Sequence, residues 1–185
     1  MGKISISPQS WIFPRPAVIV GANVDDKPNL MTVSAFGYAN VEPLTISVAI
    51  RHQRYTLQGI RQNMTFSVNI PSVDLLSEVE YCGRVSGSKV DKVEECKFKV
   101  FYGKLKSAPL IEQCPVNLEC SVAHILNLGS HSFVIGKVDE THISDNCLTD
   151  GKPDVIKIKP FVSTGTPGRR YQSLGEFLIQ QPAKK

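Results

Sequence analysis

The sequence contains no apolar run long enough to cross a membrane, and it lacks several common enzyme signatures. No hydrophobic stretch approaches the ~20 residues of a transmembrane helix. Neither GxGxxG nor a Walker loop is present, and no serine lies in a GxSxG pattern. These absences argue against a membrane protein, a Rossmann or P-loop protein and an α/β hydrolase. The first residues, MGKISISPQSW, also lack the apolar centre of a signal peptide, so we expect a cytoplasmic protein.

Cysteine and histidine are too few and too dispersed to indicate a disulfide framework or a metal site. The number of cysteines, five, is odd, and no two of them form a CxxC pair. The four histidines share no metal-ligand spacing. We therefore expect reduced thiols and no metal ion. The net charge of +4 is spread along the chain, which argues against a nucleic-acid partner but suits a small anionic ligand.

What the sequence does contain is a series of short β-branched segments bounded by turn residues. The expected strands are residues 17–21, 29–40, 45–50, 65–70, 98–102, 116–125 and 131–138, and the expected helices are residues 56 to about 63 and 73 to about 82, the second ending at Gly83. Many short antiparallel strands with few helices indicate a closed or nearly closed barrel. The 185 residues fit one domain, 1–185, with an ordered C-terminal tail from about residue 160.

One expected strand, residues 29–40 (NLMTVSAFGYAN), loses side-chain volume halfway along its length. Thr32, Ser34, Ala35 and Gly37 are small, and bulk returns only at the aromatic residues beside them. Small residues in a strand permit the close approach of a second backbone. They equally permit a flat ligand to lie against the chain, and the strand alone does not decide between these interpretations.

The segment IRHQRYTLQGI, residues 50–60, predicts an anion site. A core strand ends at Ile50, a basic turn follows, and Thr56 occupies the expected N-cap of a helix. A helix N-terminus offers unpaired N–H groups to a phosphate, and Arg51 and Arg54 would add charged donors. The alternative is that Thr56 only caps its helix and that both arginines are solvated.

Two further segments carry candidate polar groups. The loop CGRVSGSKVDK, residues 82–92, can bring backbone N–H groups and the ammonium groups of Lys89 and Lys92 to an anion, or can be a surface connection only. His131 begins a strand beside a turn, where an imidazole could contact a substrate or simply face solvent. Together, a phosphate-ready helix start, a basic Gly/Ser loop and a strand of small residues suit a flavin mononucleotide (FMN).

The order of these motifs resembles the flavin reductase-like family with the FMN-binding split-barrel fold, nearest to its flavoredoxin and ferric-reductase-like branch. The matching segments run in family order through nearly the whole chain: PRPAVIVGA, NLMTVSAFG, PLTISVAIRHQRYT, FSVNIPS, CGRVSGSKVDK, APLIEQCPVNLEC, GSHSFVIGKV and RRYQSLGEF. The resemblance implies a six-stranded antiparallel Greek-key split β-barrel with a few short helices. It also implies a homodimer that holds one FMN per subunit near the interface.

Carried over to this chain, the resemblance assigns the following cofactor-binding residues: Thr32, Val33, Ser34 and Ala35 against the flavin ring, Arg51, Tyr55 and Thr56 at the phosphate, and Ser86, Gly87, Lys92 and Tyr171 around the rest of the cofactor. His131 is similar to the histidine that lies near the nicotinamide of NADH or NADPH in flavin-reducing relatives. Those relatives often carry Gly-Asp-His where this chain has Gly129-Ser130-His131.

The implied activity is transfer of electrons from NAD(P)H through bound FMN to a flavin, ferric iron or a protein acceptor. An alternative is a flavoredoxin-type electron carrier or redox sensor that has no NAD(P)H turnover of its own and uses an electron-transfer protein partner. A third hypothesis is an oligonucleotide-binding barrel, which would require exposed aromatic side chains for base stacking. The aromatic residues of this chain fit core positions better.

Overall fold

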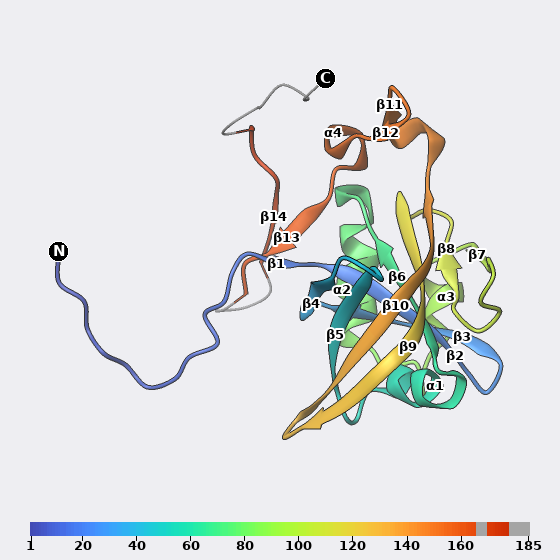
Figure 1. Ribbon diagram of the computed structural model, residues 1–185, viewed down its shortest axis with the longest axis horizontal. Helices are drawn as coiled ribbons and strands as arrows, with labels where there is room; N and C mark the ends of the chain where they lie inside the picture. The colour runs from blue at the N-terminus through green and yellow to red at the C-terminus, as the bar shows by residue number, and fades with distance from the viewer. Residues whose placement is uncertain (166–169, 178–185) are drawn as a thin grey trace.

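Seven antiparallel strands form the main sheet of the protein, in the order β3-β2-β6-β9-β10-β5-β4 (Figure 1). The computed structural model describes residues 1–165 and 170–177. The chain is mainly β, as expected, but the main sheet has seven strands and not the six expected. The strands are β2 (Val18–Val24), β3 (Lys27–Val33), β4 (Phe36–Asn40), β5 (Thr45–Arg51), β6 (Thr65–Ile70), β9 (Val116–Leu128) and β10 (His131–Ile143).

The prediction of one strand over residues 29–40 is wrong, because this segment contains two strands at opposite ends of the sheet. β3 ends at Val33, β4 begins at Phe36, and Ser34 and Ala35 connect them. Three Cα–Cα steps span at most ~11 Å, so β3 and β4, the first and last strands of the sheet, lie close together where the connection joins them. The sheet is therefore strongly curled but not closed, and the small residues lie at the opening.

β9 and β10 form a long hairpin that crosses the molecule and projects beyond it (Figure 1). Only Gly129 and Ser130 connect the two strands, so both strands are longer than the expected 116–125 and 131–138. β9 also pairs with β6, and β10 also pairs with β5. The hairpin thus joins the two halves of the sheet, and its tip lies beside the end of β5.

Two helices lie against the sheet near their expected positions. α1 (Tyr55–Asn63) packs on β2 so closely that a Cβ at Gly59 would lie 2.1 Å from the carbonyl oxygen of Asn23. α2 (Leu76–Arg84) follows the 3-10 turn η1 (Val73–Leu75). The helix continues through Gly83 to Arg84, so the prediction that Gly83 ends it is wrong.

Alternate residues of β3 face two separate apolar cores. Met31 and Val33 belong to the cluster inside the curled sheet. Leu30 belongs to a second cluster, which lies between the outer face of β2 and β3 and helix α2. Strand alternation of this kind is what a sheet with both faces covered requires, and it fixes which side chains of β3 can reach a ligand.

The remaining elements are short. Residues 98–102, expected to form a core strand, contain only the two-residue strand β7. The tail forms two three-residue strands in a small separate sheet of order β1-β13-β14, while residues 166–169 and 178–185 of it lie outside the described residues. No helix within residues 1–165 and 170–177 is long and apolar enough to cross a membrane. The short elements are β1 (Arg15–Pro16), α3 (Lys92–Glu95), β7 (Val100–Phe101), β8 (Leu110–Ile111), η2 (Asp145–Cys147), β11 (Leu148–Thr149), β12 (Lys152–Pro153), α4 (Val155–Ile158), β13 (Phe161–Ser163) and β14 (Tyr171–Ser173).

Candidate cofactor site

A cavity of about 320 Å³, here the first cavity, lies where β5 ends and α1 begins. The loop after α2 and the start of α3 close it on the other side. Two guanidinium groups, hydroxyl groups and an ammonium group surround this space, which is a donor set suited to a phosphate. Its lining residues are Met31, Arg51, Gln53, Arg54, Tyr55, Thr56, Val85, Ser86, Gly87 and Lys92. Arg54 and all six residues that the resemblance assigns to the phosphate and to the 82–92 loop are among them, whereas Lys89 lines a neighbouring cavity.

The N-terminus of α1 opens onto this cavity, but Thr56 is not its N-cap. The helix begins at Tyr55, the N-cap residue is Arg54, and no side chain accepts a hydrogen bond from the first turn. No acidic residue lies in that turn. The first N–H groups of a helix have no partner within the helix, so this turn presents donors and the positive end of the helix dipole to the cavity. The helix N-terminus therefore still offers donors at the expected anion site, although the prediction that Thr56 is the N-cap is wrong.

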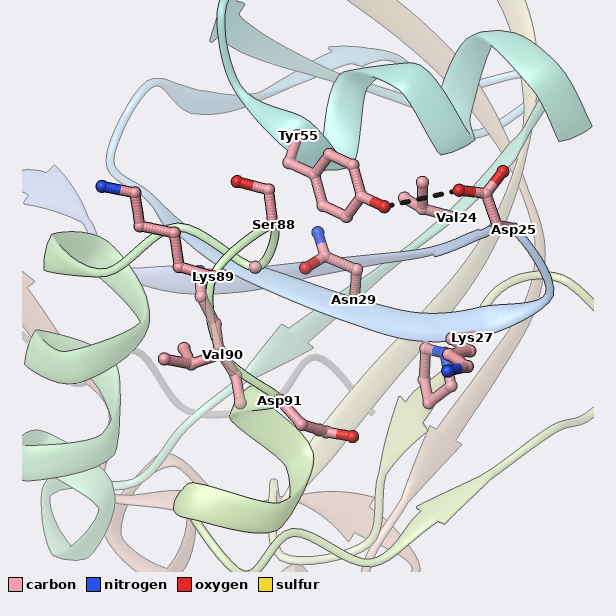
Figure 2. A pocket seen from close by; sticks show the side chains of 12 residues that line it. Val24, Asp25, Lys27, Asn29, Tyr55, Ser88, Lys89, Val90 and Asp91 are labelled. Carbon is pink, nitrogen blue, oxygen red and sulfur yellow. Dashed lines mark hydrogen bonds between the residues drawn. The ribbon is translucent and has the colours of Figure 1, made fainter.

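A second cavity of about 400 Å³ adjoins the first and shares Tyr55, Gly87 and Lys92 with it (Figure 2). Tyr55 leans across the space toward β2, and its hydroxyl donates to Asp25 Oδ2 at 3.5 Å. Charges of both signs line this cavity. Its other lining residues are Val24, Lys27, Pro28, Asn29, Ser88, Lys89, Val90 and Asp91.

Lys92 lies in the wall of both cavities and is 4% exposed. Its Nζ donates to Leu30 O at 2.7 Å and to Cys82 O at 3.0 Å. Burial lowers the pKa of Lys92 below its ordinary value. Two of its three donors therefore tie strand β3 to helix α2, and the buried ammonium supplies positive charge behind the 86–87 loop.

The four residues expected against the flavin ring occupy different environments. Thr32 donates its hydroxyl hydrogen to Val79 O of α2. Val33 belongs to the interior core. Ser34 is half-buried and Ala35 is exposed, at the opening between β3 and β4. None of the four lines either cavity, and only the 34–35 connection offers both backbone and small side chains at the surface.

His131 is half-buried at the start of β10, where it is the register partner of Arg51 on β5. Ser130 Oγ lies 2.7 Å from His131 Nδ1. The hydroxyl of Ser130 thus contacts the imidazole ring of His131. The structure brings His131 to the strand that ends at the first cavity.

Tyr171 lies apart from these residues, in β14. Its ring packs edge-on against Phe161, with ring centroids 5.4 Å apart and an angle of 82° between the planes. It also contacts the apolar cluster between the sheet and α2. Tyr171 lines neither cavity, so within this chain its contacts are those of a core aromatic residue.

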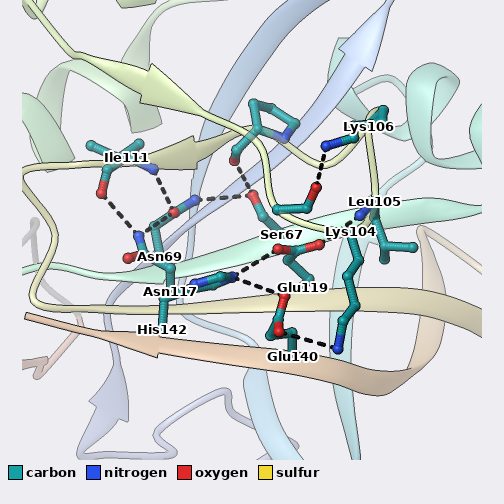
Figure 3. A network of polar contacts seen from close by, with 12 residues as sticks. Ser67, Asn69, Lys104, Leu105, Lys106, Ile111, Asn117, Glu119, Glu140 and His142 are labelled. Carbon is teal, nitrogen blue, oxygen red and sulfur yellow. Dashed lines mark hydrogen bonds and ion pairs between the residues drawn. The ribbon is translucent and has the colours of Figure 1, made fainter.

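A polar network around β9 and β10 joins His142 to two glutamates, which the spacing of the histidines did not predict (Figure 3). Glu119 is fully buried, accepts from Leu105 N at 2.7 Å, and lies 2.8 Å from His142 Nε2. Glu140 lies 3.6 Å from the same nitrogen and pairs with Lys104 at 3.1 Å. These groups come together through strand register, which spacing along the sequence does not reveal, and each has a partner within the chain.

Comparison with known proteins identifies the family. The profile of the flavin reductase like domain matches residues 10–154. This chain belongs to the flavin reductase like family. An uncharacterized protein of Archaeoglobus fulgidus is 32% identical over 146 residues, which cover 78% of this chain and 81% of that protein.

Two solved structures of flavoredoxins share the fold along nearly the full chain. The flavoredoxin of Methanosarcina acetivorans has a TM-score of 0.92 and 37% identity, covering 97% of this chain and 95% of that one. The flavoredoxin of Desulfovibrio vulgaris (Miyazaki F) has a TM-score of 0.89 and 28% identity, covering 97% of both chains. The split-barrel fold and the family membership are thereby established.

Proposed function

We propose that this protein is an FMN-binding oxidoreductase that passes electrons from NADH or NADPH, through bound FMN, to a flavin, ferric iron or a protein acceptor. The observation that carries the proposal is the first cavity, where Arg51, Arg54 and the open N-terminus of α1 converge. An FMN-binding protein from Thermus thermophilus shares this fold, with a TM-score of 0.80 and 19% identity. The donor set fits the phosphate of FMN, and the exposed 34–35 connection would accept the ring.

Bound FMN would supply the redox chemistry, and the residues of the chain would bind and orient it. The two arginines and the first turn of α1 would hold the phosphate, because charged donors and a helix N-terminus both favour an anion. The Ser130 hydroxyl holds the His131 ring through Nδ1, which leaves Nε2 to contact a nicotinamide. Gly87 and Ser86 contribute loop backbone and a hydroxyl to the same cavity.

A flavoredoxin-type electron carrier is the second candidate, and the likeness to two flavoredoxins favours it. Such a protein would exchange electrons with a partner protein and would not oxidise NADH or NADPH itself. The proposal includes a homodimer with FMN near the interface, which three exposed apolar residues of the β4–β5 hairpin support: Tyr38, Val41 and Leu44. Size-exclusion chromatography with light scattering measures that state directly.

Side-by-side reduction of the purified, FMN-loaded protein tests both functions. A reductase loses the visible absorbance of its oxidised flavin with NADH or NADPH and also with dithionite. The flavin of an electron carrier loses its absorbance with dithionite only, and keeps it even at high concentrations of NADH or NADPH. Protein that neither carries flavin nor binds added FMN in a titration would refute both.

A further inference from the structure

Asn29 and Thr56 meet in the wall between the two cavities. Asn29 lies on β3 and lines the second cavity, whereas Thr56 lies in the first turn of α1 and lines the first. Asn29 Nδ2 is 2.6 Å from Thr56 Oγ1, and the two residues are 7% and 2% exposed. Figure 2 shows the Asn29 amide pointing toward the start of the helix. The contact is short for an N–H···O bond, and both residues are largely buried.

The direction of this hydrogen bond determines which further hydrogen bond the Thr56 hydroxyl can form. An amide nitrogen donates and does not accept, so the bond uses the hydroxyl oxygen of Thr56 as an acceptor. The hydroxyl hydrogen is then free to find another acceptor, since within residues 1–165 and 170–177 the hydroxyl of Thr56 takes part only in the bond from Asn29. Leaving a buried donor unpaired is costly. The hydrogen is therefore available to a ligand oxygen in the first cavity.

Asn29 also fixes the loop that closes the site. A Cβ added at Gly87 would lie 1.6 Å from Asn29 Oδ1, so only glycine allows the loop to pass this side chain. The amide thus contacts the loop through its oxygen and α1 through its nitrogen. The amide oxygen therefore lies on the side of the loop, and the amide nitrogen lies on the side of Thr56.

We propose that Asn29 is a positioning residue that makes the Thr56 hydroxyl a donor, so that the site selects a flavin with a phosphate over one without. The phosphate of FMN offers anionic acceptor oxygens, whereas riboflavin ends in a hydroxyl group. Arg51 and Arg54 line the same cavity and act on the same charge. This inference rests on the proposed function and gives a role to Asn29, a residue to which the family resemblance assigned none.

The test is the ratio of the FMN and riboflavin dissociation constants, measured by flavin fluorescence on flavin-depleted protein. In Asn29→Asp the carboxylate accepts the Thr56 hydrogen, so FMN affinity should fall at least about tenfold while riboflavin affinity stays within about twofold. Asn23→Asp is the matched control, since Asn23 is a buried amide on β2 outside both cavities. A role in folding alone would weaken both ligands equally and would overturn the proposal.

A double-mutant cycle separates positioning from simple charge repulsion. Thr56→Val should lose FMN affinity about tenfold, and Thr56→Ser should retain it. In the Thr56→Val background, Asn29→Asp should cost much less than it does in the natural protein. An equal cost in both backgrounds would show that the new charge acts directly on the phosphate, and would refute the proposal.

If Asn29→Asp does not fold, an unchanged ratio of the FMN and riboflavin dissociation constants in Thr56→Val refutes the proposal instead. If the natural protein binds neither flavin, the proposed function itself fails.

Discussion

His131 and Arg51 are register partners on the neighbouring antiparallel strands β10 and β5. Directly opposed residues in such a pair have Cα atoms about 4.5–5.5 Å apart. Arg51 also lines the cavity at the start of α1. One strand pair therefore carries both the proposed phosphate ligand and the proposed nicotinamide contact, and substitutions on the two strands should affect different steps.

Replacing His131 by alanine should slow reduction by the nicotinamide without weakening flavin binding. The loss of one neutral hydrogen bond predicts a rate lower by up to about tenfold. Stopped-flow bleaching by NADH or NADPH measures this rate, and bleaching by dithionite should not change. His124→Ala, an exposed change on β9, is the control. An unchanged rate in His131→Ala would remove His131 from the reductase proposal.

Replacing Arg51 by alanine should weaken FMN binding. The change removes a charged donor from a phosphate, which is worth about 1.5–3 kcal/mol, and riboflavin binding should change little. The measurement is a fluorescence titration with both flavins. Arg84→Ala provides the control, because Arg84 is exposed at the end of α2 and lines neither cavity. Wild-type FMN affinity in Arg51→Ala would contradict the phosphate assignment.

Replacing Ala35 by leucine should exclude the flavin ring while the sheet stays folded. Ala35 is exposed between β3 and β4, and its carbonyl accepts from Ala49 N at 2.9 Å, a contact that the backbone makes with any side chain. Flavin occupancy after purification and the far-UV circular dichroism spectrum measure the two effects. Ala39→Leu, on the exposed part of β4, should keep the flavin. Full occupancy in Ala35→Leu would refute ring binding at this connection.

Periodicity predicted most of the sheet correctly, but it could not locate the opening of the sheet. β-branched alternation marks residues 45–50 and 65–70 because each strand is buried between packed neighbours. Residues 29–40 show the same alternation on both sides of Ser34 and Ala35. Whether such a segment continues or crosses to another strand depends on the curl of the whole sheet, which no local pattern encodes.

The candidate site was predictable where it depends on neighbours in sequence and not where it depends on tertiary contacts. A strand end followed by a basic turn and a helix placed Arg51 and Thr56 together. The partner of Thr56 is Asn29, 27 residues away, and Thr56 lies inside the first turn of the helix, not at its N-cap. An asparagine within a strand is unfavourable, and this was the available signal that Asn29 has a specific polar partner.

Asp139 makes the stability of the β9–β10 hairpin depend on pH. Its carboxylate accepts from Ser121 N and from Lys137 Nζ, each at 2.9 Å, beside an irregularity in the pairing of the two strands. Burial by itself would raise the pKa of Asp139, but the hydrogen bonds from Ser121 and Lys137 outweigh it and lower the pKa below its ordinary value. The folded state therefore favours the ionised carboxylate.

The stabilisation that Asp139 provides should be complete above its unfolded-state pKa of about 3.9 and should be lost as the pH falls through the lower folded-state pKa. Asp139→Asn should reduce the free energy of unfolding by about 1 kcal/mol at pH 7, and this difference should shrink below about pH 4. Urea unfolding at several pH values measures it. Asp26→Asn, in the exposed β2–β3 turn, should leave stability nearly unchanged. The difference in free energy of unfolding between Asp139→Asn and the natural protein could instead stay constant down to about pH 2, two units below the unfolded-state pKa. That result would show that the charge of Asp139 does not stabilise the hairpin.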